Sequence, residues 1–249
     1  MLPVRQEGYK FCQSLCVPCY QTGPDTRLKP AAFMDMAQEI AYWAAQALGF
    51  GYDSLHIHHT AWVLSRMHIH IAEMPCWRDQ VNLYTWHKGA NGLFYVRDFD
   101  LRAGDGRQLV TCTSSWVVIN EQTRRLVRPE ELENLLDQTG AVDDAIAEPA
   151  PKIALPKEAA PEPAGEHRVA FSDVDINGHT NNARYMVWAM DAIPFDQACR
   201  PVRDAYLNFI KETKPGETLQ LFRWKADDAS LVEGRDQEGK TCFVVKLVY

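Results

Sequence analysis

Apolar residues recur at helical spacing over residues 30–48, near the start of the chain. Pro30 suits the first turn of a helix, and Gly49 stands where such a helix would end. A stripe that stays apolar over so many turns predicts a helix that is mostly buried. The apolar positions are Phe33, Met36, Ala37, Ile40, Ala41, Ala44, Ala47 and Leu48.

Runs of aromatic and β-branched residues on both sides of this helix predict strands. A hairpin signal at residues 103–106 joins the last two runs, so these strands are expected to be antiparallel. A long apolar helix followed by antiparallel strands predicts an α+β fold in which a curved sheet wraps around the helix. Strands are expected at residues 7–20, 60–73, 80–87, 92–101 and 108–119, and a short surface helix at 129–138.

The same pattern begins again after a stretch rich in proline, alanine and glutamate at residues 141–165. Its composition predicts a semi-extended, solvated linker between two domains, at residues 1–140 and 166–249. In the second domain strands are expected at residues 167–172, 203–211, 218–225, 230–233 and 241–249, and an apolar-striped helix at 181–193.

The two halves align without gaps over residues 17–39 and 169–191, which places Phe33 opposite Tyr185. Identities are few, so the likeness indicates an architectural repeat more than a sequence repeat. Polar residues distinguish the copies, with Asp175, Asn177 and His179 standing opposite Gly23, Asp25 and Arg27. We therefore expect two copies of one structural unit, of which only the second carries this chemistry.

Composition narrows the class of protein. The chain has 249 residues, 46% apolar and 24% charged, which is typical of a globular protein with a sizeable core. A net charge of -7 argues against nucleic-acid binding. No apolar run approaches the roughly 20 residues that span a bilayer, and residues 1–10 lack a signal peptide's apolar core. A cytoplasmic protein with reduced cysteines is expected.

Residues 171–185 carry an unusual density of polar groups at the entry to the second predicted helix. Asp175, Asn177 and His179 alternate, so they would share one side of a strand-like segment unless a turn at Gly178 intervenes. Together with the N–H groups of a helix start, such residues can polarise a carbonyl and orient a water, as acyl hydrolysis requires. An Asx-turn with a helix N-cap explains some of the asparagines and aspartates but not the histidine.

Other candidate sites are weaker. Cys12, Cys16 and Cys19 have the spacing of an iron–sulfur motif, but on a strand Cys19 would face away from the other two. The histidines at positions 68 and 70 share a strand face without further ligands at convincing spacing. No glycine-rich nucleotide fingerprint and no nucleophile elbow occur. The sequence therefore predicts no metal and no cofactor.

The stretch Ser172-Asp-Val-Asp-Ile-Asn-Gly-His-Thr-Asn-Asn-Ala-Arg-Tyr185 resembles the S-D-x-D-x-N-x-H-x-N-N-x-x-Y signature of the acyl-acyl carrier protein (acyl-ACP) thioesterases of plants and bacteria. Further matches in the right order lie at residues 60–66, 75–79, 84–86, 114–120 and 123–126, so the resemblance covers nearly the whole chain. It implies a tandem hotdog fold and hydrolysis of the thioester of a fatty acyl-ACP, which releases the free fatty acid.

Carried over by position, the resemblance implies that Asp175, Asn177 and His179 are catalytic and that Glu212 is the fourth member. Local sequence alone favours a solvated carboxylate for Glu212. Many plant members have a cysteine directly after this glutamate, whereas this chain has Thr213. Direct attack by a water, activated by Glu212 or His179, is therefore the expected mechanism.

The acyl chain is expected to run into the first unit, along the buried face of the helix at 30–48. Trp43, Trp62, Leu64 and Met67 are the expected contacts, and Asn181 is expected to bind the substrate near the thioester. The implied partner is an acyl carrier protein with a phosphopantetheine-linked acyl chain, and a homodimer is possible but not required. A basic surface for that carrier would draw on Arg27, Arg184, Arg200, Arg203 and Lys211.

Three alternatives stay open at this point. The same residues suit an acyl-CoA thioesterase, and a hydratase or dehydratase of the same fold uses similar Asp and His chemistry. An acyl-binding module without catalysis is disfavoured, because a binder needs none of the four polar residues. Chain-length preference, the general base and the oligomeric state are not decided by the sequence.

Overall fold

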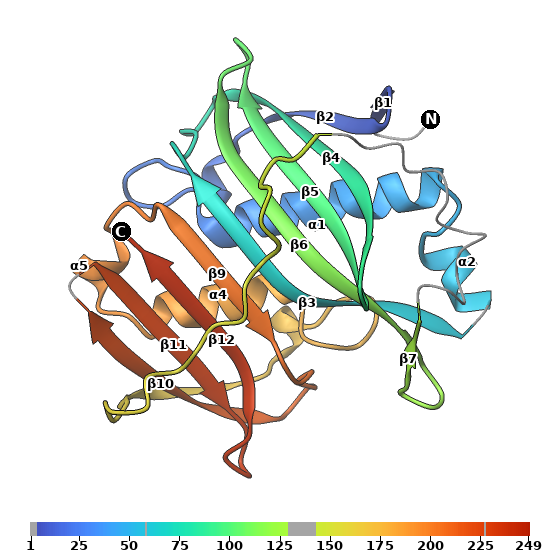
Figure 1. Cartoon of the computed structure of the whole chain (residues 1–249). Helices are drawn as coiled ribbons and strands as arrows, with labels where there is room; N and C mark the ends of the chain where they lie inside the picture. Colours follow the sequence, from blue (N-terminus) through green and yellow to red (C-terminus); the bar gives the residue numbers. More distant parts are fainter. Residues whose placement is uncertain (1–3, 58, 129–142, 227) are drawn as a thin grey trace. The chain divides into compact units, whose positions relative to one another are not determined.

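The computed structural model describes residues 4–57, 59–128, 143–226 and 228–249; the expected helix at residues 129–138 lies outside these ranges. The chain forms two compact units, coloured along the sequence from blue to red in Figure 1. The first consists of Met1–Ser65 and Ile69–Ala150, and the second of Arg66–His68 and Pro151–Tyr249.

The first unit is an antiparallel sheet packed on one long helix, as the apolar pattern predicts. Its strands follow the order β1-β2-β4-β5-β6-β3, and the predicted turn at residues 103–106 joins β5 to β6. The helices are α1 (Pro30–Ala47), α2 (Tyr52–Ile57) and the 3-10 turn η1 (Cys19–Gln21). The strands are β1 (Arg5–Glu7), β2 (Lys10–Cys16), β3 (Thr60–Ile71), β4 (Gln80–Asn91), β5 (Phe94–Ala103), β6 (Gln108–Asn120) and β7 (Leu126–Val127).

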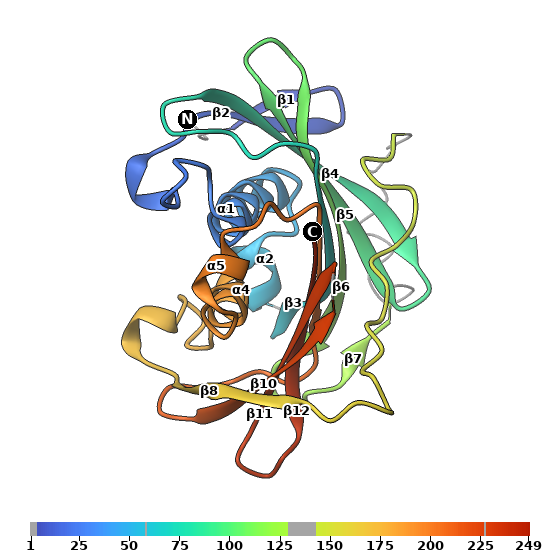
Figure 2. The same cartoon turned by 90° about the vertical axis from the view of Figure 1, so that its left-hand side faces the viewer.

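Helix α1 confirms the prediction for residues 30–48. Phe33, Ile40 and Ala44 on its stripe are fully buried, and α1 lies along one face of strands β4 to β6, here called the inner face (Figure 2). Burying a side chain such as Phe33 contributes about 1.5–3 kcal/mol. Gly49 has a positive φ of 81°, a conformation that suits glycine and ends the helix.

The second unit repeats this arrangement with shorter elements. Its strand order is β9-β12-β11-β10-β8, and all four neighbouring pairs are antiparallel. The strands are β8 (Glu162–Arg168), β9 (Asp204–Phe209), β10 (Thr218–Ala226), β11 (Ala229–Arg235) and β12 (Thr241–Val248). The helices are the 3-10 turn η3 (Phe171–Asp173), α4 (Asn182–Asp191) and α5 (Phe195–Ala198).

Aromatic packing joins α4 to its own sheet. The Tyr185 ring lies 5.0 Å from that of Phe243 on β12 and 5.7 Å from that of Phe209 on β9. Trp188, one turn further along α4, stacks at 4.3 Å on His167 of β8. The helical face predicted from Tyr185 and Trp188 is therefore the face that packs on the sheet.

Two predicted strands are shorter than expected, for local reasons. The strand predicted at residues 167–172 ends at Arg168, because Asp173 accepts the Ala170 N–H at 2.8 Å and closes a 3-10 turn. The strand predicted at residues 7–20 is split into β1 and β2 by a tight turn at Gly8, which has a φ of 63°.

The first described part of the predicted linker, up to Ala150, is bound to the sheet of the first unit. Residues 143–150 run over the sheet face of the first unit that points away from α1, here called the outer face (Figures 1 and 2). The Trp86 indole donates to the Asp143 carbonyl at 2.9 Å, and the Ala145 N–H donates to Asp98 at 2.8 Å. Lys88 pairs with Asp98 at 3.2 Å. The sequence did not predict these contacts.

The next part of the segment is held in the same manner by the second unit. Asn208 on β9 accepts the Ile153 N–H at 2.8 Å and donates to the Pro151 carbonyl at 3.0 Å. The Trp224 indole on β10 donates to the Ala159 carbonyl at 2.9 Å, and Ile153 packs on a cluster that includes Trp224. We refer to residues 143–161 as the strap, because side chains of each sheet bind its backbone.

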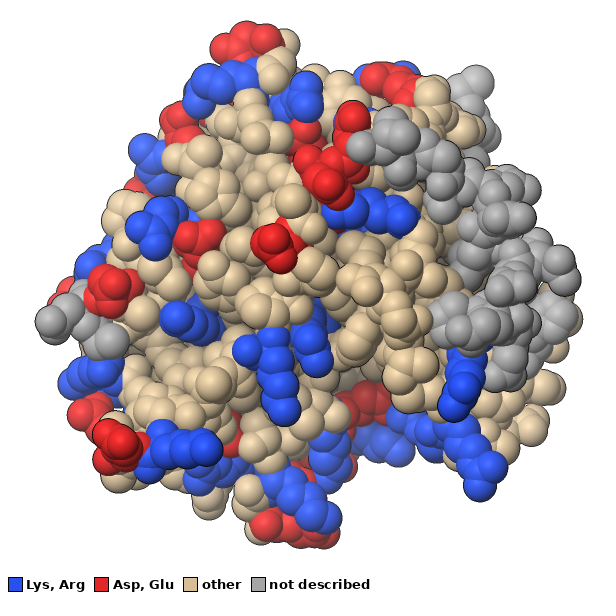
Figure 3. All heavy atoms as spheres, in the orientation of Figure 1, with Lys and Arg blue, Asp and Glu red and all other residues tan. Residues whose placement is uncertain are grey.

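The face of the molecule shown in Figure 3 carries acidic and basic side chains interspersed. Such mixing provides no continuous basic track of the kind that follows a phosphate backbone. Among the helices that the structure describes, none combines the length and the apolar character needed to cross a membrane.

The inner face of the first sheet contains a buried polar pair that the pattern of apolar residues in the sequence does not predict. His87 on β4 lies directly opposite Arg97 on β5, and both side chains are buried. Arg97 donates to the Thr85 hydroxyl at 3.2 Å, and burial lowers the pKa of Arg97 to about 10. Burial, and then the charge of Arg97, lowers the pKa of His87 to about 3. The histidine is therefore neutral in the folded protein at any physiological pH.

This shift predicts a specific sensitivity to acid. An unfolded chain protonates His87 near pH 6.5, whereas the folded chain does so only near pH 3, so stability falls as pH drops through this window. The slope from this one group is at most about 1.4 kcal/mol per pH unit. In urea unfolding from pH 7 to about pH 4.5, His87→Phe is expected to show a flatter decline than wild type by roughly 2 kcal/mol.

A matched control is His59→Asn, because His59 is exposed and Asn tolerates its positive φ of 51°. We expect this variant to change the slope less than His87→Phe does. An unchanged slope in His87→Phe would contradict a neutral His87.

Candidate active site

The segment between β8 and α4 forms a closed loop that fixes the candidate residues. Val174 and Thr180 form an antiparallel bridge at its base, and Asp175 N donates to the His179 carbonyl at 2.9 Å. Gly178 N donates to the Asp175 carbonyl at 3.0 Å, and Gly178 has a φ of 75°. The segment is thus a tight turn. The turn at Gly178, which was expected to be the exception to a shared side for alternate residues, is therefore present.

Asp175 organises the turn through its carboxylate. One oxygen accepts the backbone N–H groups of Asn177 at 2.9 Å and His179 at 3.4 Å. The other accepts one carboxamide N–H of Asn177 at 3.3 Å. Asp175 therefore positions both neighbours, while the second carboxamide N–H of the exposed Asn177 stays available to a ligand.

His179 meets Glu212 across the second unit. Their Nε2 and Oε2 atoms lie 3.8 Å apart, and the two side chains are 32% and 27% exposed. This separation exceeds a direct hydrogen bond but is short enough for one water to contact both groups. An imidazole and a carboxylate this close together could act as an acid–base pair.

Thr213 holds the two halves of this pair together. Its carbonyl accepts the Thr180 N–H at 3.1 Å, and its hydroxyl lies 2.7 Å from the Thr180 hydroxyl and 3.0 Å from that of Tyr185. Only 1% of Thr213 is exposed. Because Thr180 follows His179 and Thr213 follows Glu212, these bonds set the distance between the two catalytic candidates.

Backbone N–H groups at the start of α4, which were expected to help bind the substrate, make hydrogen bonds within the fold. The Asn181 side chain caps the helix by accepting the Ala183 N–H at 2.8 Å, and Asn181 N donates to the Asp173 carbonyl at 2.8 Å. Thr180 N is likewise bound to Thr213. The N-cap alternative therefore accounts for the Asn181 side-chain oxygen, and the backbone N–H groups of Thr180 and Asn181 are not available to an oxyanion. Substrate binding by the Asn181 carboxamide N–H groups stays a prediction.

A contact between Asp173 and His167 links the loop to strand β8. Burial opposes ionisation of Asp173, but hydrogen bonds from Ala170 N and from His167 lower its pKa below the usual range. The His167 Nε2 atom lies 2.9 Å from the Asp173 carboxylate. The sequence did not point to His167, because a lone histidine in a strand carries no local signal for such a contact.

The first unit contains the same loop without its chemistry. Thr22 and Leu28 form the equivalent bridge, Gly23 N donates to the Arg27 carbonyl at 2.8 Å, and Thr26 N donates to the Gly23 carbonyl at 3.0 Å. Thr26 has a positive φ of 65°, as Gly178 does in the second unit. The two loops therefore have equivalent backbone hydrogen bonds, which agrees with the repeat inferred from the sequence.

The position of the acid–base pair is filled differently in this copy. Arg27 takes the place of His179 and donates to the Met74 carbonyl at 3.1 Å. Leu28 N donates to the Pro75 carbonyl at 2.8 Å, as Thr180 N does to Thr213. With methionine and arginine at these places, the first loop lacks both the base and the acid.

Family models match both halves of the chain. The model for the acyl-ACP thioesterase N-terminal domain covers residues 8–135, and that for the C-terminal domain covers residues 157–242. The chain belongs to the acyl-ACP thioesterase family. The resemblance inferred from the signature at residues 172–185 is thereby confirmed.

Curated relatives are plant proteins of greater length. Oleoyl-acyl carrier protein thioesterase 2 of Arabidopsis thaliana is 27% identical over 209 residues, which cover 76% of this chain and 55% of that protein. The dodecanoyl-[acyl-carrier-protein] hydrolase of Cinnamomum camphora is 30% identical over 204 residues, covering 75% and 52%. The chain spans about half the length of these relatives.

Solved structures establish the fold. The acyl-ACP thioesterase of Bacteroides thetaiotaomicron superposes with a TM-score of 0.81 at 22% identity, over 96% of this chain and 97% of that one. The 12:0-ACP thioesterase of Umbellularia californica gives a TM-score of 0.81 at 22% identity, over 98% of each chain. The predicted tandem hotdog fold is confirmed.

Thr213 directly follows Glu212 and carries a hydroxyl that could be considered as a nucleophile. Here the hydroxyl at that position is buried, and its partners in the described structure are the hydroxyls of Thr180 and Tyr185. A nucleophilic hydroxyl needs a base within hydrogen-bond reach. Thr213 is therefore a structural residue.

The residues expected to contact the acyl chain lie on α1 and β3. Leu64 and Met67 are each 4% exposed, and Trp62 is half-buried with its indole donating to the Phe50 carbonyl at 3.2 Å. Trp43 is half-buried, and its indole donates to Glu39 one turn earlier at 2.6 Å. Leu64 and Met67 are thus buried, and Met67 lies in the segment Arg66–His68, which belongs to the second unit. Acyl binding by these residues stays a prediction.

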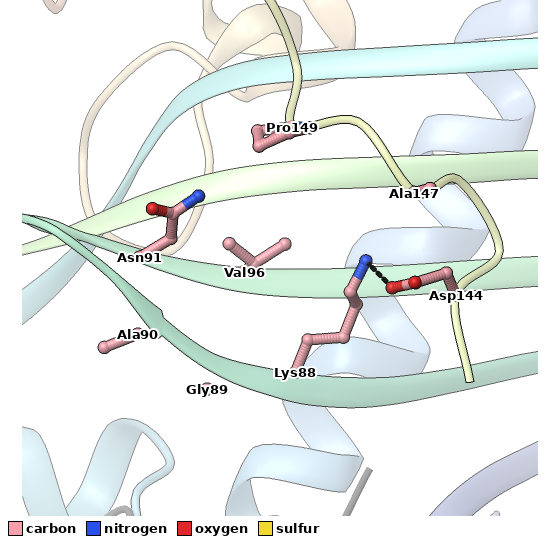
Figure 4. A pocket seen from close by; sticks show the side chains of 8 residues that line it. All are labelled: Lys88, Gly89, Ala90, Asn91, Val96, Asp144, Ala147 and Pro149. Carbon is pink, nitrogen blue, oxygen red and sulfur yellow. Dashed lines mark ion pairs between the residues drawn. The ribbon is translucent and has the colours of Figure 1, made fainter. Parts of the chain in front are cut away.

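A separate small pocket lies over the outer face of the first sheet. Its lining includes Lys88 and Val96 from the sheet and Asp144 from the strap, and Lys88 forms an ion pair with Asp144 (Figure 4). None of the predicted site residues lines it. This pocket belongs to the contact between strap and sheet.

The hydroxyl cluster of Thr180, Tyr185 and Thr213 leads to a stability prediction. Thr213→Val removes the hydroxyl that contacts both Tyr185 and Thr180 in this buried cluster, so the variant is expected to lose about 1–3 kcal/mol in urea unfolding. Thr213→Ser keeps the hydroxyl and is expected to lose less. In a double-mutant cycle, Thr213→Val and Tyr185→Phe should couple by about 0.5–3 kcal/mol, and strictly additive losses would contradict the cluster.

Proposed function

We propose that this protein hydrolyses the thioester of fatty acyl-ACP and releases a free fatty acid and the carrier thiol. The observation that carries the proposal is the His179–Glu212 pair at 3.8 Å, held beside the Asp175–Asn177 turn in the second unit. Membership in the acyl-ACP thioesterase family supports the carrier-linked substrate.

In the proposed mechanism a water between His179 and Glu212 attacks the thioester carbonyl. One of the two residues takes its proton as the new C–O bond forms. The free carboxamide N–H of Asn177, oriented by Asp175, donates to the carbonyl oxygen as negative charge develops. The C–S bond then breaks, and the thiolate takes up a proton from His179 or from solvent.

The proposed assignment gives Asn181 a supporting task. Its side chain caps α4 and so fixes the start of the helix that follows the loop. The oxyanion donor is accordingly the Asn177 carboxamide, and the backbone N–H groups of Thr180 and Asn181 serve the fold.

The acyl tail is proposed to bind the first unit beside Trp43, Trp62 and Leu64. Apolar contact there contributes about 0.8 kcal/mol per buried methylene, so the length of the accessible apolar surface would set the preferred chain length. The first unit retains the fold but has Arg27 and Met74 where the second has His179 and Glu212. That exchange is consistent with tail binding in the first unit and catalysis in the second.

A cytoplasmic location and a homodimer remain predictions. The plant relatives are chloroplast proteins. An acyl-CoA thioesterase is the alternative to be tested with the same assay.

We predict that Glu212→Gln and His179→Ala each lower kcat about 10²–10⁴-fold, because each removes one partner of the acid–base pair. The measurement is release of free thiol from acyl-ACP and acyl-CoA of matched acyl length. Glu166→Gln is the control, an exposed carboxylate on β8 of the same unit, and should keep wild-type turnover. Absence of thiol release by wild type for every acyl length and carrier would refute the proposed function.

A further inference from the structure

Three large apolar side chains are exposed around the candidate catalytic loop. Phe171 is 97% exposed, Ile176 is 81% exposed and Ile210 is 59% exposed. We call these three residues the apolar rim. Isolated exposed apolar residues are ordinary, but several around one site mark a surface that binds a partner.

The rim lies next to the acid–base pair. Ile176 is a central residue of the turn that runs from Asp175 to Gly178, and His179 follows that turn directly. Ile210 precedes Glu212 by two residues, so their Cα atoms are at most about 7 Å apart. Phe171 opens the 3-10 turn whose last bond, from Val174 N to the Phe171 carbonyl, leads into the loop.

Exposed charges beside the rim are mainly basic. Arg168, Lys211 and Lys214 are exposed, and Glu166 on β8 is an exposed carboxylate, whereas Asp173, Asp175 and Glu217 are more covered and serve the loops. Asp173 binds the Ala170 N–H, Asp175 binds the turn, and Glu217 accepts the Lys214 N–H at 3.1 Å. Lys211 is paired with Asp236 at 2.6 Å, which leaves Arg168 and Lys214 as the freer cations.

We propose that the apolar rim, with Arg168 and Lys214 beside it, is the surface on which the acidic carrier protein docks. The inference rests on the proposed function, since whatever delivers a thioester to His179 and Glu212 must stand at the edge of this loop. A carrier helix with acidic and apolar side chains matches both features of the surface. A second copy of this chain on the rim would instead cover the loop.

The fold supplies a matched control for this proposal. Phe195 is 74% exposed and lies just beyond the C-terminal end of α4, whereas the loop precedes its N-terminal end. A ten-residue helix separates these ends by about 15 Å. Phe195 thus has the same chemical character in the same unit but lies away from the rim.

The test compares one acyl group on two thiols, the holo-carrier protein and N-acetylcysteamine. For each variant the ratio of kcat/KM on the carrier substrate to kcat/KM on the small thioester is measured. Ile176→Asp, Ile210→Asp and Phe171→Asp are each expected to lower this ratio about tenfold or more, through KM of the carrier substrate. Phe195→Asp should leave it within about twofold of wild type.

Direct binding separates this proposal from the proposed function. Fluorescence anisotropy of labelled holo-carrier protein should show weaker binding to the three rim variants than to wild type, whether or not any thioester is cleaved. Equal losses on both thioesters, or unchanged carrier binding, would overturn the proposal. A wild-type dimer that Ile176→Asp converts to monomer would assign the rim to a second copy and overturn it as well.

Discussion

The hydrogen bonds between Thr180 and Thr213 are the constraint on which the candidate site depends. They join two segments more than thirty residues apart, one ending in His179 and the other in Glu212, and so bring an imidazole within 3.8 Å of a carboxylate. The pair itself is half-exposed, and an ion pair in that setting holds little energy of its own. The buried hydroxyls and the backbone hydrogen bond, rather than attraction between His179 and Glu212, therefore hold the two side chains close together.

The duplicated loop shows how a fold separates shape from chemistry. Both units close the turn with the same backbone bonds, and both place a positive φ at the same point, on Thr26 in one and Gly178 in the other. The conformation therefore does not require the candidate catalytic side chains. What differs is the content of the positions that the turn presents, with Arg27 in the first unit and His179 in the second. The same loop conformation can therefore carry different side chains.

Much of the fold followed from the chain's pattern of apolar residues. Helix α1, the strands of both sheets and the repeat are all present in the predicted order, because burial of one face leaves a periodic trace. The site was harder to predict from the sequence than the fold. Asp175, Asn177 and His179 stood out by density, but Glu212 has no local signal and came only from family resemblance. The roles of Thr213 and His167, the buried Arg97 and the contacts of the strap depend on partners distant in sequence, which periodicity does not report.

The strap limits where the chain can be divided when one unit is exchanged for that of a relative. Each of its halves is bound by side chains of one sheet, through Trp86 and Lys88 in the first unit and Asn208 and Trp224 in the second. A junction chosen for exchange of units between relatives therefore cannot be placed anywhere in residues 143–161 as if they were a spacer. Each sheet has to travel with the piece of strap that it binds, so within the strap the seam belongs between Ala150 and Pro151, while Arg66–His68 on β3 also belong to the second unit. Cutting elsewhere would strip indole and amide groups of their partners on an otherwise intact sheet.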